Sequence, residues 1–172
     1  MQKIFYVIPA IVAAVIVAAY VKIHEWPPQL PNPGIETSNL INGKEPPNTP
    51  TMSMSEVRVL DVEVGDNQII TSRTTRKFGT RSPIHIHPYG GQTCVLTGEM
   101  TLYMDGAEPL VAKAGDCYWM PPKRRMTGVN TSKTDTVMLD SFVVPKGTQV
   151  WLVVEPGQED AQEQFDKLFH SH

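Results

Sequence analysis

Two histidines and a glutamine near the middle of the chain have the types and the spacing of metal ligands. They are His85, His87 and Gln92, within residues 79–98. Residues two apart in a β-strand face the same side, so the imidazoles of His85 and His87 can bind one metal ion together. Gln92 follows a turn at Gly90-Gly91 and begins a second strand, whose even-numbered side chains are expected to return to the same face. The sequence therefore predicts a site where two imidazoles and a carboxamide converge.

These residues resemble the first motif of the cupin family, G-x5-H-x-H-x3-4-E-x6-G. Gln92 stands at the usual glutamate, and the last glycine arrives one residue early. Residues 115–130 resemble the second motif, G-x5-P-x-G-x2-H-x3-N, and matches and mismatches both occur. Gly115, Asp116, Pro121 and Asn130 fit in register, whereas the third family histidine falls on Met126 and the middle glycine on Lys123. The resemblance implies an all-β, cupin-type jelly-roll β-barrel over residues 55–156.

The same resemblance implies one transition-metal ion, which could be Fe, Mn, Ni, Cu or Zn. The candidate ligands in this chain are His85, His87, Gln92 and Met126. Glutamine is a neutral, weak donor, and the thioether of Met126 favours Cu(I) if it coordinates rather than packs in the core. The histidines either bind metal or form a vestigial pair held by hydrogen bonds inside the barrel. No general base stands out near the motifs, so the catalytic residues stay unknown.

The hydrophobic pattern from residue 55 onward independently predicts an all-β domain. Short strands are expected at 57–64, 68–75, 84–87, 93–96, 100–104, 110–112, 117–120, 137–144 and 150–155. Turn signals such as Asp105-Gly106 separate them, and many short strands of this kind indicate a sandwich or barrel. Residues 157–172 read as an amphipathic helix with the apolar stripe Phe165, Leu168 and Phe169, followed by a solvated tail with His170 and His172.

The amino-terminal segment, residues 1–25, has the composition of a membrane anchor. Residues 4–21 form an uncharged, apolar run of 18 residues, close to the roughly 20 that cross a bilayer as a helix. Tyr20, Lys22 and Trp26 suit the membrane interface. We expect a retained single-pass transmembrane helix in the inner (cytoplasmic) membrane, with a cleaved secretory signal as the alternative. Lys3 before the span favours a cytoplasmic amino terminus, which leaves the barrel on the periplasmic or extracytoplasmic side.

Residues 26–54 are rich in proline and read as an extended tether. Seven prolines lie between residues 26 and 52, and proline blocks helix formation by removing a backbone donor. Apolar residues are spaced along this segment, and we expect them to contact a partner protein unless the segment is only a flexible spacer. They are Leu30, Ile35, Leu40 and Ile41.

Composition limits the remaining possibilities. A chain of 172 residues suits one domain with appendages, and a net charge of -3 gives no reason to expect nucleic-acid binding. Cys94 and Cys117 are read as small buried hydrophobes rather than as a disulfide. The basic run 123–125 could hold an anionic substrate, contact lipid headgroups or an acidic partner, or be a solvated loop.

Three functions from different classes follow from these features. The favoured one is a membrane-anchored accessory or structural subunit that attaches to a larger integral membrane complex such as a respiratory or photosynthetic assembly. This interpretation leans against an enzyme but leaves the question open. Its partners would be the lipid bilayer and other membrane-protein subunits. The alternatives are a metal-dependent enzyme, such as a dioxygenase, isomerase or lyase acting on a small organic ligand, and a metal-binding module.

Overall fold

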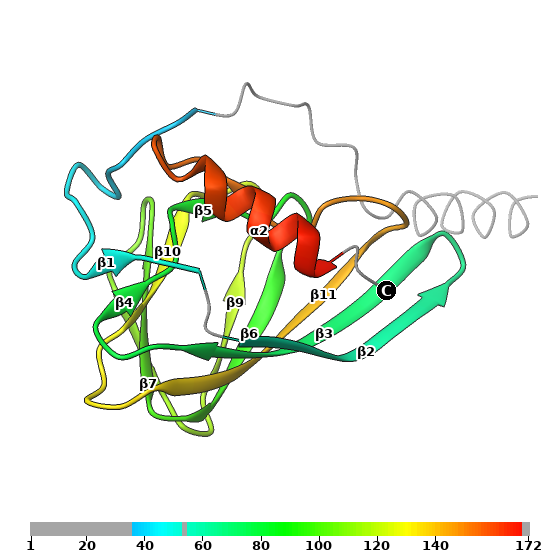
Figure 1. Cartoon of the computed structure of the whole chain (residues 1–172), viewed down its shortest axis with the longest axis horizontal. Helices are drawn as coiled ribbons and strands as arrows, with labels where there is room; N and C mark the ends of the chain where they lie inside the picture. Colours follow the sequence, from blue (N-terminus) through cyan, green and yellow to red (C-terminus); the bar gives the residue numbers. More distant parts are fainter. Residues whose placement is uncertain (1–35, 53–54, 170–172) are drawn as a thin grey trace, which may run out of the picture. The chain divides into compact units, whose positions relative to one another are not determined.

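The structure is a computed structural model that describes residues 36–52 and 55–169 of the chain (Figure 1). Its strands are β1 Thr49–Pro50, β2 Ser55–Val64, β3 Asn67–Arg76, β4 Thr80–Arg81, β5 His85–Ile86, β6 Gly91–Thr97, β7 Glu99–Met104, β8 Leu110–Lys113, β9 Cys117–Met120, β10 Met126–Asn130, β11 Thr136–Pro145 and β12 Leu152–Val153; its helix is α2 Glu159–Phe169. The predictions of an all-β domain and of a short carboxyl-terminal helix are confirmed.

The strands form two sheets whose inner faces enclose the core. One sheet has the order β2-β3-β11-β6-β9 and is antiparallel throughout. The other runs β1-β4-β10-β5-β12, with β7 pairing β10 and β8 pairing β7. Apart from the consecutive pairs β2–β3 and β7–β8, neighbours in these sheets are not consecutive in sequence, as in a jelly roll. Figure 1 shows the sheets facing each other.

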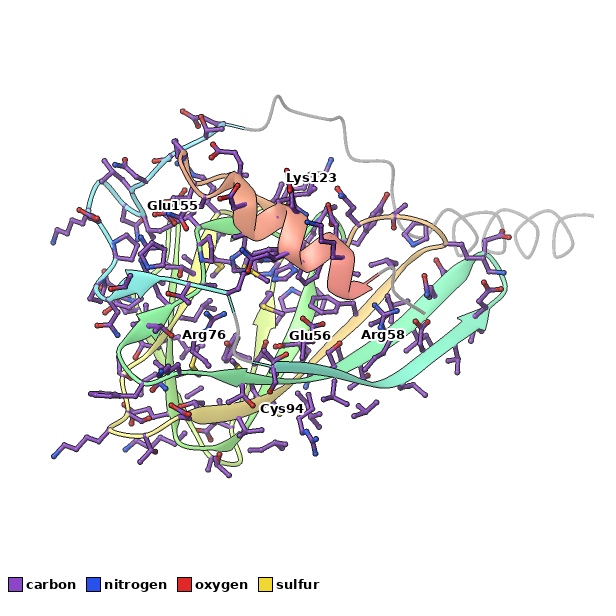
Figure 2. The ribbon with its side chains drawn as sticks, viewed as in Figure 1. Glu56, Arg58, Arg76, Cys94, Lys123 and Glu155 are labelled. Atoms are coloured by element: carbon purple, nitrogen blue, oxygen red, sulfur yellow. A yellow bond between two sulfur atoms is a disulfide. The ribbon has the colours of Figure 1, made fainter. Side chains whose placement is uncertain are left out.

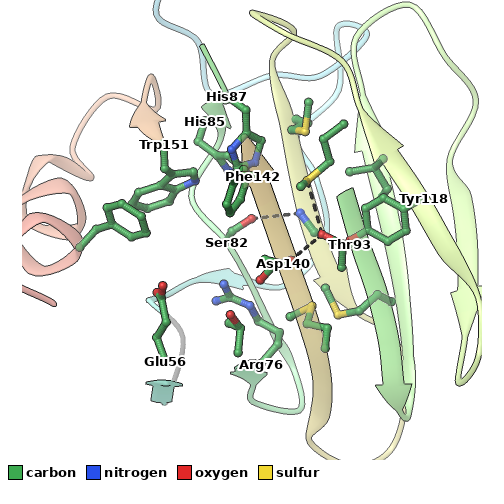
Figure 3. Close-up of a pocket in the computed structure, with 18 of the residues that line it drawn as sticks. Glu56, Arg76, Ser82, His85, His87, Thr93, Tyr118, Asp140, Phe142 and Trp151 are labelled. Carbon is green, nitrogen blue, oxygen red and sulfur yellow. Dashed lines mark hydrogen bonds between the residues drawn. The ribbon is translucent and has the colours of Figure 1, made fainter. Parts of the chain in front are cut away.

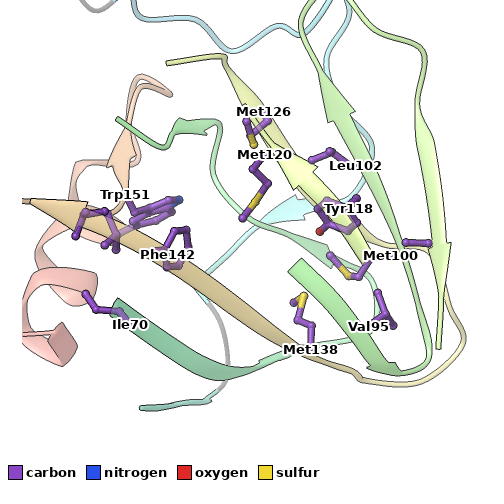
Figure 4. Packing of buried hydrophobic residues seen from close by; sticks show 14 residues of the cluster. Ile70, Val95, Met100, Leu102, Tyr118, Met120, Met126, Met138, Phe142 and Trp151 are labelled. Carbon is purple, nitrogen blue, oxygen red and sulfur yellow. The ribbon is translucent and has the colours of Figure 1, made fainter. Parts of the chain in front are cut away.

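Alternation along the strands decides which side chains enter the core. In β11, Met138, Phe142 and Val144 are buried, whereas Val143 between them is 54% exposed. The main apolar cluster includes four buried methionines together with aromatic side chains such as Phe142 and Trp151 (Figure 4). The helix α2 adds Phe165, whose ring centroid lies 4.7 Å from that of Trp151. The predicted amphipathic helix thus packs against the barrel through Phe165, while His170 and His172 lie outside the described residues.

Residues 36–52, predicted as part of an extended tether, are attached to the barrel instead. Strand β1 pairs in parallel with β4, and the Ser38 N–H donates to the Val154 carbonyl over 2.9 Å. Ile41 was expected to contact a partner, but it is 4% exposed and packs with Ile84, Ile86 and Val154. Leu40 is 37% exposed. Leu30 and Ile35 lie outside the described residues.

The described residues contain no helix that is long and apolar enough to cross a membrane. The predicted span at residues 4–21, with Tyr20, Lys22 and Trp26, lies outside the described part of the chain.

Cys94 and Cys117 form a disulfide, so their prediction as buried hydrophobes is wrong. They are directly opposed in the register of β6 and β9. Their neighbours Thr93, Val95 and Tyr118 are buried, so by alternation both cysteines lie on the outer face of the five-stranded sheet (Figure 2 labels Cys94). Cys117 is exposed and Cys94 is half-buried. The register therefore brings the two thiols together on the solvent side of the sheet, where no apolar packing requires them.

Candidate functional site

The two histidines face each other inside the barrel. His85 is 6% exposed and His87 is 4% exposed. Their Nε2 atoms lie 3.2 Å apart, and the ring planes are nearly perpendicular at 84°. His85 Nδ1 lies 2.8 Å from the Pro83 carbonyl oxygen, and His87 Nδ1 lies 2.7 Å from that of Val150. The predicted pairing of the two imidazoles is what the structure contains.

These hydrogen bonds determine which ring nitrogens carry protons. A carbonyl oxygen only accepts, so both Nδ1 atoms must be N–H donors, and in the neutral rings both Nε2 atoms then present lone pairs. Burial lowers the pKa of His87 to about 4 and that of His85 well below its ordinary value, so both rings are neutral at pH 7. Two lone pairs 3.2 Å apart repel each other unless a cation lies between them. Backbone carbonyls on the other nitrogen are also the usual support of histidine ligands, so the pair fits a metal ion.

Gln92 does not join this pair, and the predicted parity of its strand is wrong. Gly91 and Thr93 of β6 face inward, whereas Gln92 is exposed on the outer face opposite Trp119. Its amide donates to Cys94 Sγ over 3.3 Å. At Gly91, a Cβ atom would lie 2.5 Å from the Phe142 ring, so that ring occupies the space that an inward ligand on this strand would need.

Met126 lies beside the histidines as the second motif predicts. It is fully buried on β10 and pairs in register with His85 of β5, which places their side chains next to each other on the inner face. Four further methionines line the same cavity: Met52, Met100, Met120 and Met138. The described residues contain no group of three or more His, Cys, Asp or Glu side chains that could hold a metal ion. The available donors are therefore two imidazoles and soft thioethers, which do not fit the complete cupin set of three histidines and a carboxylate.

The histidines and methionines line a cavity of about 90 Å³ between the sheets (Figure 3). Aromatic side chains form part of its wall and pack against the histidines. The His85 and Trp151 ring centroids are 5.2 Å apart, and those of His87 and Phe142 are 5.0 Å apart. Phe165 of α2 also lines the cavity. The barrel thus holds a small internal space with imidazole, thioether and aromatic walls.

Ionisable side chains that the motifs did not indicate line the rest of the cavity, namely Glu56, Arg76, Tyr118 and Asp140. Burial raises the pKa of Glu56 to about 7 and also raises the pKa values of Asp140 and Tyr118, whereas it lowers the pKa of Arg76 to about 10. The Thr93 hydroxyl donates to Asp140 over 2.5 Å. One sequence signal could have revealed Asp140, because it stands at an inward position of an otherwise apolar strand. Glu56 has inward parity on β2, but no apolar run marks that face.

The basic run 123–125 forms a turn whose backbone supports the site. Lys123 has a positive φ of 59°, and its N–H donates to the His87 carbonyl over 2.9 Å. The Arg125 side chain pairs with Asp105 over 2.5 Å and with Glu36 over 3.6 Å. Arg125 is thus occupied in surface ion pairs, and Arg124 is exposed. None of the three side chains lines the cavity.

Two facing sheets of this connectivity, enclosing a ligand-sized cavity, define the class of double-stranded β-helix barrels. Residues 73–145 match the family model described as Cupin domain, so this part of the chain is similar to cupin domains in sequence. A comparison with curated proteins finds no match.

Solved structures with a similar barrel share little sequence with this chain. A cupin-like protein from Thermotoga maritima is 19% identical with a TM-score of 0.47, and the match covers 63% of this chain and 81% of that one. A conserved protein with a double-stranded β-helix domain from Klebsiella pneumoniae is 20% identical with a TM-score of 0.45, over 62% and 90%. Oxalate oxidase in complex with glycolate is 22% identical with a TM-score of 0.44, over 50% of this chain and 46% of its own. Likenesses this distant do not say what this chain binds.

Proposed function

We propose that the barrel is a metal-binding cupin domain that holds one soft transition-metal ion, foremost Cu(I), through His85, His87 and Met126. The observation that carries the proposal is the pair of Nε2 lone pairs facing each other at 3.2 Å, with both Nδ1 protons held by backbone carbonyls. Without a cation, this arrangement is repulsive in a buried site.

The identity of the metal follows from the donors that surround the histidines. Imidazole accepts several transition metals, but a thioether selects Cu(I) over hard divalent ions, which prefer carboxylate oxygen. Met126 adjoins His85, and Gln92 points away. A bound copper ion would supply one-electron redox chemistry or Lewis acidity to the cavity.

A competition titration of Cu(I) against bathocuproine disulfonate tests the proposal. Ascorbate serves as the reductant so that the Cys94–Cys117 disulfide stays intact. We expect His87→Gln to weaken Cu(I) binding by more than about 100-fold, beyond the 10- to 100-fold loss typical of residues that only support a ligand. Met126→Leu is expected to weaken Cu(I) binding while leaving Zn(II) binding unchanged.

Met138→Leu is the matched control, because Met138 lines the same cavity from the opposite sheet. Its Cu(I) affinity should equal that of the wild type. Equal affinity in the wild type and in His87→Gln would refute the proposed site.

We also propose that the barrel lies outside the cytoplasm, attached to the inner membrane by the segment 1–25. The Cys94–Cys117 disulfide supports this location, because structural disulfides persist in oxidising compartments and are rare in the cytosol. Blocking free thiols in whole cells before lysis, followed by reduction and labelling, measures the redox state directly. The extracytoplasmic location predicts two thiols that become labelled only after reduction, and a fully reduced pair would contradict it.

Attachment to a larger membrane complex is the third part of the proposal. Its support is the apolar character of Leu30, Ile35 and Leu40, the last of which stays 37% exposed on the barrel. Gentle detergent solubilisation and purification through this chain should recover other membrane subunits in fixed proportion. Recovery of this chain alone would argue against an accessory role.

A further inference from the structure

A second chemical site shares the cavity with the histidines. Glu56 of β2, Arg76 of β3 and Asp140 of β11 come from three adjacent strands of the five-stranded sheet. In Figure 3 these three side chains gather at one end of the cavity, while His85 and His87 lie at the other. No sequence motif includes the three residues, and the metal site does not use them.

The charges in this group do not balance. The group has two carboxyls and one guanidinium, and the two histidines nearby are neutral. Asp140 has the closer partners, because Thr93 donates to it over 2.5 Å, Thr74 also hydrogen-bonds to it and the positive charge of Arg76 stabilises its ionised form. Glu56 forms no ion pair within the described residues. Glu56 is therefore the less strongly partnered of the two carboxyls, stabilised by the Ser72 hydroxyl and by the charge of Arg58 without an ion pair.

The surroundings of Glu56 allow it to hold or release a proton near neutral pH. The facing groups are Ser72 of the neighbouring strand β3, Asp140 of β11 and Arg58 on its own strand. Burial and the charge of Asp140 raise its pKa, whereas the Ser72 hydroxyl and Arg58 lower it. The result, about 7, is the value at which a carboxyl acts most effectively as a general acid or base.

We propose that Glu56 is a catalytic base that moves a proton within a small carbonyl compound bound in the cavity. The assignment goes beyond metal binding and does not rest on it, because its residues are separate from His85, His87 and Met126.

The proton transfer balances without any further reactant. The Glu56 carboxylate takes a proton from the carbon next to the carbonyl, and the C–H electron pair becomes the new C=C bond. The C=O π pair moves onto oxygen, where the Arg76 guanidinium supplies positive charge that stays in place at neutral pH. Protonated Glu56 then returns the proton to the substrate at the same or a neighbouring atom, which completes an exchange or an isomerisation.

The size of the cavity limits the substrate class. A volume of about 90 Å³ has room for about six water-sized groups, at about 15 Å³ for each. Oxo compounds of three or four carbons, such as pyruvate, 2-oxobutyrate and dihydroxyacetone, are of this size. A hexose, with twelve non-hydrogen atoms, exceeds this volume.

Deuterium exchange tests the proposal without knowledge of the natural substrate. The full chain is incubated in D2O with pyruvate, 2-oxobutyrate or dihydroxyacetone, and proton NMR follows loss of the C–H signal next to the carbonyl. We expect exchange of at least one probe above the buffer rate, with a rate that rises through pH 7 as Glu56 ionises. Glu56→Gln should lower the protein-catalysed rate about 100-fold or more and abolish that pH dependence.

The matched control is Glu63→Gln. Glu63 lies on the same strand as Glu56, and its exposed carboxylate pairs with Lys146. It should exchange at the wild-type rate. Circular dichroism checks folding. If Glu56→Gln does not fold, Glu56→Asp replaces it, since this variant keeps the carboxyl but draws it back by one methylene. It should also lower the rate, by about 10-fold or more.

The two proposals fail separately. Exchange is measured with and without a chelator, and activity in either arm that Glu56→Gln lowers supports the assignment to Glu56. No exchange of any probe in either arm, or equal rates for the wild type and Glu56→Gln, would overturn it. Glu56→Gln should keep wild-type Cu(I) affinity, so a loss of metal binding in His87→Gln is read independently of the exchange result.

Discussion

Gly91 explains at the level of single residues why the cavity lacks a third ligand on β6. It is the inward residue nearest to the histidines on that strand, and a side chain there would meet the Phe142 ring. Phe142 in turn packs against His87, with ring centroids 5.0 Å apart. The Phe142 ring therefore fills the space that a carboxylate ligand could occupy. The histidine pair is supported by aromatic packing and not by a carboxylate.

Gly91→Ala is expected to destabilise the barrel by about 1–3 kcal/mol, because the added methyl group overpacks against Phe142. Urea denaturation measures the loss. Adding Phe142→Leu makes room, so the double variant should lose less than the sum of the two single variants. Gly128→Ala is the control, since its methyl group would meet only the flexible end of Met100 and should cost less than about 1 kcal/mol. An unchanged stability of Gly91→Ala would show that Phe142 is free to move.

The sequence could predict which side chains share a face within one strand, but not which face the side chains of the next strand take. The spacing of His85 and His87 fixes their relation within one strand, so their convergence was predictable. Gln92 follows a turn in which Gly90 has a φ of +77°, and a difference of one residue in such a turn reverses every side chain beyond it. The same reversal turns Cys94 outward to meet Cys117. Alternation alone could not place Gln92 or pair the cysteines, because both depend on register between strands.

The site residues missed by the motifs depend on contacts between distant strands. Glu56 and Asp140 are 84 positions apart and meet only because β3 pairs with both β2 and β11. Ile41 looked available to a partner because its own segment is rich in proline, yet its burial partners Ile84, Ile86 and Val154 lie more than 40 positions away. Local composition could not reveal either arrangement.

The segment that carries the histidines is held by a buried ion pair. Both Glu155 carboxylate oxygens accept from Arg81 over 2.7 Å, and one of them also accepts from the Ile84 N–H over 2.7 Å. Both side chains are buried, with Arg81 1% exposed and Glu155 7% exposed. The pair therefore connects the end of β12 to the chain immediately before His85.

Glu155→Gln should cost about 3–5 kcal/mol in the free energy of unfolding, because it leaves the Arg81 charge buried without its partner. Lys146→Gln, which breaks the exposed pair with Glu63, is the control and should change stability by less than about 1 kcal/mol. Chemical denaturation measures both. The Arg81→Leu, Glu155→Gln double variant should recover part of the lost free energy of unfolding, because it removes the unpaired charge. Equal stability of Glu155→Gln and Lys146→Gln would contradict this explanation.

The disulfide attaches the edge strand β9 to β6, with a sequence separation of 23 residues. Closing a loop of this length stabilises the folded state by about 3 kcal/mol in the chain-entropy description. Reduction with dithiothreitol should therefore lower the urea midpoint of the wild type. The Cys94→Ala, Cys117→Ala double variant should have that lower midpoint with or without the reductant. A wild type indifferent to reductant would mean that β9 needs no such attachment.

The buried acids and the buried histidines set the pH dependence of the whole molecule in opposite directions. His87 has a folded pKa of about 4, below its ordinary 6.5, so only the unfolded chain binds its proton between these values. Stability from this group falls as the pH drops from 6.5 to 4. Glu56 has a folded pKa of about 7, above its ordinary 4.5, so only the folded protein binds its proton in that window. Stability from Glu56 rises as the pH drops from 7 to 4.5, and the two effects oppose each other between pH 4.5 and 6.5.

In the metal-free protein, replacing Glu56 should reveal the pH dependence that His87 causes, and replacing His87 should reveal the pH dependence that Glu56 causes. Glu56→Gln is expected to lose stability more steeply than the wild type as the pH falls from 6.5 to 5, by about 1 kcal/mol per pH unit. His87→Gln should show the reverse change, because the proton uptake of Glu56 in the folded state is then less opposed. Urea midpoints at several pH values measure the slopes, and Glu63→Gln should follow the wild type since its carboxylate is exposed. The pKa of His85 is lowered like that of His87, and the pKa of Asp140 is raised like that of Glu56. Each variant therefore keeps one histidine or one acid that still contributes to the pH dependence of stability. Identical slopes in all four proteins would mean that these groups titrate as they do in solvent, and would remove the physical basis for placing proton chemistry at Glu56.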